Sequence, residues 1–314
     1  MVNLILNENM KVYRRYRTWA MIGFMIAIVI LLSSIDWYYD NKNASDTTWQ
    51  LELTEMNAHY KSTLDSSDLA EEHKVWAREQ LALNEYRLAH DIAPESGTMW
   101  SGINGAASLV ILITLFTVII AGDSLAGEFS TGTIKLLLIR PANRLKILVA
   151  KYLSMLMFGI LLLLVLFISS ILVNGILYQF DSAGMPYLTI DPAGVVHEHS
   201  MIANLWKTYL LNGVSTIMFV TLAFMISAAF RSSAMAIGFG IFLLFAGSIL
   251  MEVLRPYDWA KYLLFANIDL TQYISGQPYQ EGMTLGFSIA VLVGYYILFN
   301  LVAWLVFTKR DVAA

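Results

Sequence analysis

Six stretches of the chain are apolar and carry no Asp, Glu, Lys or Arg over the length that a membrane-spanning helix needs. Their predicted bounds are 18–35, 102–122, 152–178, 208–230, 234–251 and 283–307. About 20 residues of helix cross a hydrocarbon core of about 30 Å. Because lipid offers the backbone no hydrogen-bond partners, each stretch is expected to be a helix. The pattern therefore predicts an all-α integral membrane protein with six transmembrane helices.

Twelve of the 20 basic residues lie at the two termini and in every second segment between these stretches. They are Lys11, Arg14, Arg15 and Arg17 in 1–17; Lys135, Arg140, Arg144, Lys146 and Lys151 in 123–151; Arg231 between the fourth and fifth spans; and Lys309 and Arg310 in 308–314. Lys and Arg of short loops stay on the cytoplasmic side of a membrane. Both termini are therefore expected in the cytoplasm, and segments 36–101, 179–207 and 252–282 are expected outside.

The segment 36–101 is the one large polar insertion, with five basic and thirteen acidic residues. On both sides of Ser66–Asp68, apolar residues recur at spacings of three, four and seven, which predicts two antiparallel helices packed on each other. We expect Trp76 and Leu83 in the packing face. The hairpin is either a small structural cap or an arm that contacts a ligand or a partner. Periodicity by itself signals packing, so the cap is favoured.

The composition narrows the possible chemistry. Of 314 residues, 57% are hydrophobic and 14% charged, and the net charge is −4. The chain has no cysteine, which excludes disulfides, thiolate metal sites, iron–sulfur clusters and a cysteine nucleophile. No basic patch is interleaved with aromatic residues, so nucleic acid is not an expected partner.

A few polar residues stand out in or near apolar surroundings. The tripeptide 197–199 (His-Glu-His), with Asp191 nearby, could ligate a metal, but its spacing is not that of a zinc site, and a solvated external loop is favoured. Asn174, Asn212 and Asn300 lie within predicted spans, where they suit hydrogen bonds between helices.

The cytoplasmic segment 123–151 mixes charge with strong apolarity. Glu128 lies where the second span leaves the membrane, and residues 133–139 predict a short amphipathic helix ended by Pro141. Residues 136–139, Leu-Leu-Leu-Ile, are too apolar for a free cytosolic loop. They need either the membrane interface or a protein partner to cover them.

This segment resembles the cytoplasmic signature of the ABC-2 type permeases, the membrane subunits of bacterial ATP-binding-cassette exporters. The matching residues are Glu128, Gly132, Thr133, Ile134, Lys135, Leu137, Leu138, Arg140, Pro141, Arg144 and Lys151. The six spans, the internal termini and the closing sequence of residues 307–311 also match. The insert 36–101 is longer than in small members of that family.

The resemblance implies an ABC-2 type exporter topology in a bacterial plasma membrane. It implies that 123–151 contains a coupling helix that docks on an ATPase, with candidate ATPase-coupling residues Glu128, Gly132, Thr133, Lys135, Leu137, Leu138, Arg140, Pro141 and Arg144. It also implies that 1–17 forms an interfacial amphipathic helix, with Leu4, Ile5, Val12 and Tyr16 as its apolar residues. Short re-entrant helices are implied in 252–282.

The implied function is that of a permease subunit that exports a hydrophobic or amphipathic cargo, such as an antimicrobial peptide, a lipid-like compound or a drug. The chain has no Gly-x-x-x-x-Gly-Lys-Ser/Thr loop for ATP phosphates. ATP and magnesium would therefore belong to cytosolic ATPase subunits, and this chain would hold no cofactor and catalyse no reaction. Membrane lipid and a second permease copy or paralogue are its other expected partners.

Two alternatives from other classes stay open. The first is a membrane sensor whose external hairpin binds a ligand, although five further spans exceed what an anchor requires. The second is an ion-coupled carrier. No ionisable residue lies inside a predicted span, which weakens this reading, but carbonyl groups of broken helices could still bind an ion.

Overall fold

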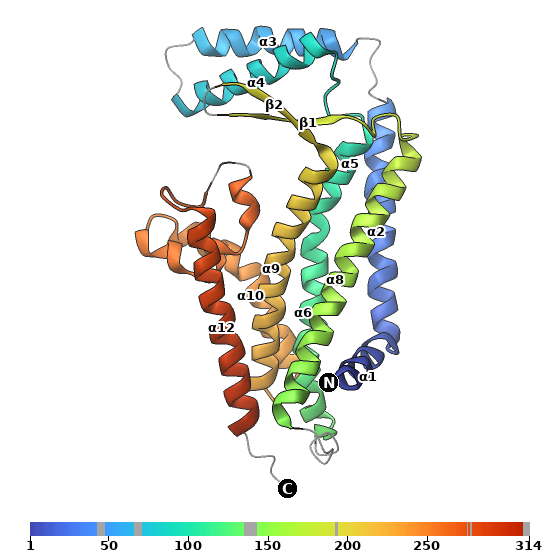
Figure 1. Cartoon of the computed structure of the whole chain (residues 1–314), viewed down its shortest axis with the longest axis vertical. Coiled ribbons are helices and arrows are strands. Elements are labelled where there is room, and N and C mark those ends of the chain that lie inside the picture. The colour runs from blue at the N-terminus through green and yellow to red at the C-terminus, as the bar shows by residue number, and fades with distance from the viewer. Residues whose placement is uncertain are drawn as a thin grey trace. The chain divides into compact units, whose positions relative to one another are not determined.

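The computed structural model describes residues 1–42, 48–65, 71–134, 143–191, 194–274, 276 and 278–309. In this part of the chain, six helical runs are long and apolar enough to cross a membrane (Figure 1). They are α2 (Tyr16–Lys42), α5 (Met99–Ala106) continued through η1 (Ala107–Leu109) into α6 (Val110–Ser130), α8 (Arg144–Leu177), α9 (Met201–Ala229), α10 (Ser233–Leu254) and α12 (Leu285–Lys309). The predicted helical, multi-pass membrane protein is confirmed.

Two of these helices extend well into the segment that the sequence assigned to a cytoplasmic connection. The second span was expected to end at residue 122, but α6 continues to Ser130. The third was expected to begin at residue 152, but α8 begins at Arg144. The apolar pattern marks only the part of a helix that can lie in hydrocarbon. Charged residues do not end a helix when the folded protein supplies them with partners.

The chain forms two compact units, which are described separately. The first comprises Met1–Ala27, Ser108–Phe167 and Thr208–Ala314, and the second comprises Ile28–Ala107 and Ile168–Lys207. The first unit also contains α1 (Val2–Tyr13) and the short helices η2 (Asp258–Tyr262), α11 (Leu264–Asn267) and η3 (Leu270–Tyr273). In the most apolar part of the α5–α6 run and of α9, 56% and 61% of the residues are buried. In the corresponding part of the remaining four apolar helices the share is 17–28%. The apolar run that ends in α6 and helix α9 are therefore the most enclosed.

Hydroxyl groups join α6 to α9 inside the first unit. Thr114 Oγ1 and Thr216 Oγ1 lie 3.0 Å apart in the buried interface. Further along, Ser227 Oγ donates to the carbonyl of Gly122 and accepts from the amides of Leu125 and Ala126. A side chain of α9 thus shares in the backbone hydrogen bonding of α6, which fixes the register of the two helices where an apolar contact alone would let them slide.

Small residues allow α6 and α10 to approach closely. A Cβ atom on Gly240 would lie 2.7 Å from Val118, and one on Gly122 would lie 3.2 Å from the Cα atom of Ile237. Helices in lipid gain little from hydrophobic burial and associate through close packing, so glycine at these contacts favours the pair.

The short helices before α12 are held by one buried amide. Asn267 Nδ2 donates to the carbonyl oxygens of Lys261 and Leu263, at 2.6 and 2.8 Å. Its Oδ1 accepts a hydrogen bond of 2.7 Å from Ser288 of α12. The sequence predicted short helices in 252–282, and this network keeps them folded against α12.

The outer face of α12 is apolar and exposed. Leu285, Ile289, Val293, Ile297 and Leu301 recur every four residues and are 40–59% exposed. A continuous apolar stripe of this kind is unfavourable in water and suits lipid or a second protein surface.

The second unit contains the two helices of the insert, α3 (Trp49–Asp65) and α4 (Glu71–His90). Leu53 and Tyr60 of α3 and Ala77 of α4 are buried between them. In the same interface Asn84 Nδ2 donates to Asn57 Oδ1 at 3.0 Å. A buried amide pair fixes the alignment of two helices because any shift leaves both groups without a partner.

The prediction that Trp76 lies in the packing face is wrong. Its side chain is 50% exposed and makes a T-shaped contact with Tyr60, with ring centroids 5.5 Å apart. Leu83 is half-buried. The face is rotated by one residue, to Ala77 and Asn84, because a close approach of two helices accepts a small side chain and a paired amide more readily than an indole.

The segment 179–207 is more ordered than the loop that the sequence predicted. It contains an antiparallel hairpin, β1 (Pro186–Ile190) and β2 (Val196–Ser200), and the first residues of α9. His197 on β2 lies 3.1 Å from Asp191. Within the described residues, no group of three or more His, Cys, Asp or Glu side chains is placed to hold a metal ion.

Single cysteines should report the expected topology, because the natural chain has none. Ser130→Cys at the end of α6 and Glu55→Cys on α3 both occupy exposed positions. We expect an impermeant maleimide to label Glu55→Cys in intact cells and Ser130→Cys only after permeabilisation. The cysteine-free parent gives the background. Labelling of Ser130→Cys from outside would show that the orientation is inverted.

Asn84→Ala should loosen the α3–α4 hairpin, because it leaves the buried Asn57 amide without its partner, at a cost of about 1–3 kcal/mol. Hydrogen exchange of the full-length protein should accelerate in both helices by roughly ten-fold or more. The exposed substitution Glu55→Ala serves as the control and should leave exchange within about two-fold of the wild type. Equal exchange in Asn84→Ala and the control would mean that the amide pair does not hold the hairpin.

Candidate functional site

Four charged side chains from three helices form a closed ring at the end of α6. Nζ of Lys151 in α8 lies 2.8 Å from Oε2 of Glu8 in α1 and 3.1 Å from Oε1 of Glu128 in α6. Nζ of Lys11 in α1 lies 2.9 Å from Oε1 of Glu8 and 3.0 Å from Oε1 of Glu128. Each cation contacts both carboxylates. We call Glu8, Lys11, Glu128 and Lys151 the charge ring; its formal charge is balanced.

Burial makes the pairing of Lys151 essential. Its side chain is 3% exposed, and those of Glu8 and Glu128 are 10% and 17% exposed. The ammonium group also donates to the carbonyl oxygen of Ser124 at 3.2 Å, so all three of its N–H groups have an acceptor. Removal of one member of a buried ion pair leaves the other charge uncompensated, which costs about 3–5 kcal/mol.

The charge ring also alters the acid–base properties of the α1 side chains. Burial alone would raise the pKa of Glu8, but the attraction of Lys151 and hydrogen bonds from Lys151 and Lys11 outweigh it, so its pKa lies below the ordinary value. Burial would lower the pKa of Lys11, but hydrogen bonds to Glu8 and Glu128 raise it above the ordinary value. Both groups therefore stay charged at neutral pH.

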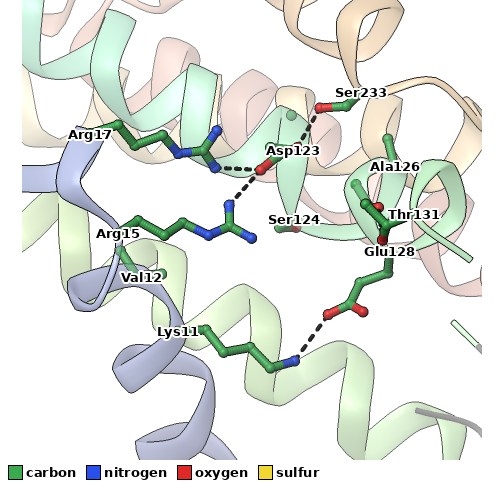
Figure 2. Close-up of polar contacts among 12 residues, drawn as sticks. Lys11, Val12, Arg15, Arg17, Asp123, Ser124, Ala126, Glu128, Thr131 and Ser233 are labelled. Atoms are coloured by element: carbon green, nitrogen blue, oxygen red, sulfur yellow. Dashed lines mark hydrogen bonds and ion pairs between the residues drawn. The ribbon is translucent and has the colours of Figure 1, made fainter. Parts of the chain in front are cut away.

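A second carboxylate, Asp123, precedes Glu128 on α6 and contacts side chains from three other parts of the chain. Arg15 Nη1 lies 2.6 Å from its Oδ2 atom, and Arg17 donates to the same oxygen (Figure 2). Ser233, the first residue of α10, donates to Oδ1. We call Arg15, Arg17, Asp123 and Ser233 the arginine cluster. It fixes the turn between α1 and α2 against α6 and α10.

A cavity of about 880 Å³ lies between the charge ring and the arginine cluster. Residues from both groups line it, together with Ser124 of α6 and hydroxyl side chains that follow, Ser130, Thr131 and Thr133. Figure 2 shows Ser124 on α6 between Asp123 and Glu128. The cavity can hold a small polar molecule or headgroup, because its walls carry charges of both signs and several hydroxyl groups.

Helix α1 buries two polar residues against the protein and exposes an apolar stripe. Glu8 and Asn9 are buried, and Asn9 Oδ1 accepts a hydrogen bond of 2.7 Å from Ser154 of α8. Val2 and Leu6 are 68% and 58% exposed, and Met10 follows them at 49%. This arrangement suits a helix that lies at a membrane interface.

The apolar face of this helix differs from the predicted one. Val12 packs inside the protein, Leu4 and Ile5 are half-buried, and Tyr16 lies beyond the end of α1. The sequence pattern misplaced the face because Glu8 pairs with Lys151 of α8 and Lys11 pairs with Glu128 of α6. The apolar residues on the other side of α1 are then the exposed ones.

The comparisons with known proteins agree with a membrane protein. A family model described as Protein of unknown function (DUF2705) matches residues 80–313. This chain belongs to the DUF2705 family. It is 43% identical over 319 residues to the Uncharacterized protein YhcI of Bacillus subtilis (strain 168), and the match covers all of both chains. It is 34% identical over 208 residues to the Uncharacterized membrane protein YdbK of the same organism, which covers 65% of this chain and 80% of the relative.

The candidate coupling residues of this DUF2705 protein fall into two groups. Lys135, Leu137, Leu138, Arg140 and Pro141 lie outside the described residues. The other four lie on either side of that gap: Glu128, Gly132, Thr133 and Arg144.

The four described candidates end α6 and begin α8. Gly132 has a φ of +72°, which lets the chain leave α6 without strain, and Thr133 Oγ1 donates to the Glu128 carboxylate at 2.5 Å. Arg144 is the first residue of α8, and its Nη1 donates to the carbonyl of Thr308 in α12 at 3.0 Å. Glu128 and Arg144 therefore connect the two ends of the predicted coupling segment to other helices.

The sequence did not identify the partners of Glu128. Glu8 and Lys11 sit three residues apart in an otherwise largely apolar N-terminal helix, and Lys151 sits at the border of the third apolar stretch. The position of these charged residues beside apolar residues is the one local signal that their side chains are buried. Nothing in the local pattern assigns Glu8 to Lys151, which is 143 residues away.

The effect of one substitution in the charge ring on stability should change sign when a second residue of the ring is also substituted. Lys151→Met leaves the ring with two carboxylates and one cation, and should destabilise the protein by about 3–5 kcal/mol. Glu8→Gln should destabilise the wild type but stabilise Lys151→Met, because the remaining Lys11 and Glu128 then balance. The measurement is thermal unfolding in detergent.

An exposed ion pair of the same chain provides the control for this cycle. Arg255 and Glu252 lie 3.8 Å apart and are 56% and 69% exposed, so Arg255→Met should cost under about 1 kcal/mol. If Glu8→Gln lowers stability equally in both backgrounds, the four charges do not act as one ring.

Proposed function

We propose that this DUF2705 protein is the membrane-spanning subunit of an ATP-driven exporter whose ATPase is a separate polypeptide. The observation that carries the proposal is the charge ring. It binds Glu128, at the N-terminal side of the segment that resembles a coupling helix, to α1 and α8 at the same point. A coupling element must pass a displacement to the helices that form the pathway, and a ring of partly buried ion pairs supplies a stiff connection.

The connections extend through the bundle from both ends of that segment. At the α6 end, Ser227 of α9 is bonded to the backbone at Gly122, Leu125 and Ala126. At the α8 end, Arg144 is bonded to the end of α12. A displacement at the end of α6 or the start of α8 would therefore be passed to α1, α9 and α12.

In this proposal the chain performs no chemistry. Two cytosolic ATPase subunits bind and hydrolyse ATP with magnesium, and their closure moves the coupling segment on the cytoplasmic side of a bacterial plasma membrane, where both termini also lie. The exposed apolar stripe of α12 contacts lipid or a second permease. The cargo is hydrophobic or amphipathic, such as an antimicrobial peptide, a lipid-like compound or a drug, because the apolar stretches offer no charged ligand for a strongly polar solute.

A second candidate is a membrane sensor. It is favoured by one observation, that the insert helices α3 and α4 belong to a compact unit distinct from most of the apolar bundle. A sensor would need a ligand on that unit and would not need a stoichiometric ATPase. An ion-coupled carrier is a third candidate, and it would transport in the presence of an ion gradient without ATP.

The test is affinity purification of the tagged full-length chain from its own host, with measurement of bound ATPase and of vanadate-sensitive ATP hydrolysis. Leu137→Asp/Leu138→Asp should abolish both, because two carboxylates would have to be desolvated in the docking groove at a cost of several kcal/mol. The matched control is Leu51→Asp/Met56→Asp, which replaces two apolar residues that are 47% and 45% exposed on α3. It should retain the ATPase.

Each alternative predicts a different pattern. If wild-type protein carries no ABC-type ATPase at near-equal stoichiometry, the exporter proposal fails and the sensor or carrier gains support. If the Leu137/Leu138 variant keeps both the ATPase and its activity, the segment is not the coupling element. A loss of ATPase from both double variants would indicate general damage to the fold.

A further inference from the structure

We propose that the cavity between the charge ring and the arginine cluster binds the phosphate group of an anionic membrane lipid, with Arg17 and Ser124 as principal ligands. The residues concerned line one cavity of about 880 Å³, within the range of about 300–1,000 Å³ typical of small-molecule sites. The inference goes beyond the transport function and does not depend on it.

The cavity has a surplus of positive charge at one end. Its lining includes four basic side chains, Lys11, Arg15, Arg17 and Lys151, and three carboxylates. In the charge ring two cations face two carboxylates. In the arginine cluster both guanidinium groups contact the single oxygen Oδ2 of Asp123. A phosphate diester carries one negative charge, which would complete the balance at this end, and guanidinium groups bind phosphate through paired hydrogen bonds.

Two buried polar atoms in the cavity lining lack a partner. The Nε atom of Arg17 and the Oγ atom of Ser124 have no hydrogen-bond partner among the residues that the structure describes. Buried donors are nearly always bonded in folded proteins, and an unmet one calls for an explanation. A phosphate group in the cavity supplies acceptors for both kinds of donor, because phosphate oxygens accept from N–H and O–H groups alike.

The surroundings favour a lipid as the source of that phosphate. Next to the arginines, Tyr16 and Trp19 are 87% and 60% exposed, and such aromatic residues lie at headgroup level in membranes. On α1, the helix that precedes these arginines, the stripe of Val2, Leu6 and Met10 is exposed and suits the boundary between headgroups and acyl chains. A soluble phosphate has the same oxygen chemistry but gains nothing from these apolar neighbours.

The experiment measures binding to the purified full-length protein in detergent by native mass spectrometry and by the shift in unfolding temperature. The probes are phosphatidylglycerol, phosphatidylcholine and inorganic phosphate. The wild type should prefer phosphatidylglycerol to both others. Arg17→Gln should weaken phosphatidylglycerol binding by about ten-fold or more, since it removes a charged donor. It leaves Asp123 paired with Arg15, so the fold should persist.

Ser124→Ala separates binding from folding. It removes a hydroxyl group that has no partner among the described residues, so the unfolding temperature without lipid should not fall. Phosphatidylglycerol should nevertheless bind roughly ten-fold more weakly, as expected for a lost hydrogen bond to a charged group. If Arg17→Gln fails to fold, this variant alone decides the question.

The matched control is Arg231→Gln/Lys309→Gln, which removes two exposed cations on the same expected side of the membrane but outside the cavity. It should leave the affinity for phosphatidylglycerol within about two-fold of the wild type, because dispersed surface charge is screened. The proposal is overturned if Ser124→Ala binds phosphatidylglycerol like the wild type, or if the control loses as much affinity as Arg17→Gln. Inorganic phosphate that matches phosphatidylglycerol in affinity would overturn the lipid as its source.

Discussion

A lysine that is almost fully buried cannot remain charged without partners, and the packing of α1 against α6 and α8 follows from that constraint. Lys151 is 3% exposed, and its three donors are used by Glu8, Glu128 and the carbonyl of Ser124. The two carboxylates in turn need a second cation, which Lys11 supplies. Because Glu8 and Lys11 are one turn apart on α1, the same requirement brings that whole helix against α6 and α8. Charge balance thus contributes to fixing the position of the N-terminal helix.

This arrangement explains why α1 buries Glu8 and Asn9. In a water-soluble protein the apolar side of a helix packs inward, and the polar side meets solvent. Here Glu8 and Asn9 bond to α8, while Val2, Leu6 and Met10 remain exposed. The exposed apolar residues suit apolar surroundings, which agrees with six helices long enough to cross a membrane. The same inward face leaves a cavity whose walls are charged.

The rest of the bundle relies on close contacts and hydrogen bonds between helices. Lipid tails cover apolar side chains as well as another helix does, so apolar burial gives little preference for one helix arrangement over another. Gly122 and Gly240 allow α6 and α10 to touch, and Ser227 bonds α9 directly to the backbone of α6. These contacts lie within a few residues of Asp123. Packing, backbone hydrogen bonding and charge pairing are therefore concentrated in the same part of α6. A displacement there would move most of the helices of the first unit.

The sequence by itself determined the six apolar helices, the helical insert and the expected sidedness, because hydropathy and loop charge are properties of each segment that hold whatever the other segments do. It also identified Glu128 and the region of Gly132 and Thr133 as unusual. It placed Trp76 in a packing face that belongs to Ala77 and Asn84, ended α6 too early, and did not anticipate the hairpin at 186–200. Only the tertiary structure decided that Glu128 meets Lys11 and Lys151, and that Asp123 gathers two arginines. Lys151 is 23 positions from Glu128, but the other pairs join residues more than 100 positions apart, and no local pattern encodes which of several charges beside apolar runs will meet when the helices pack.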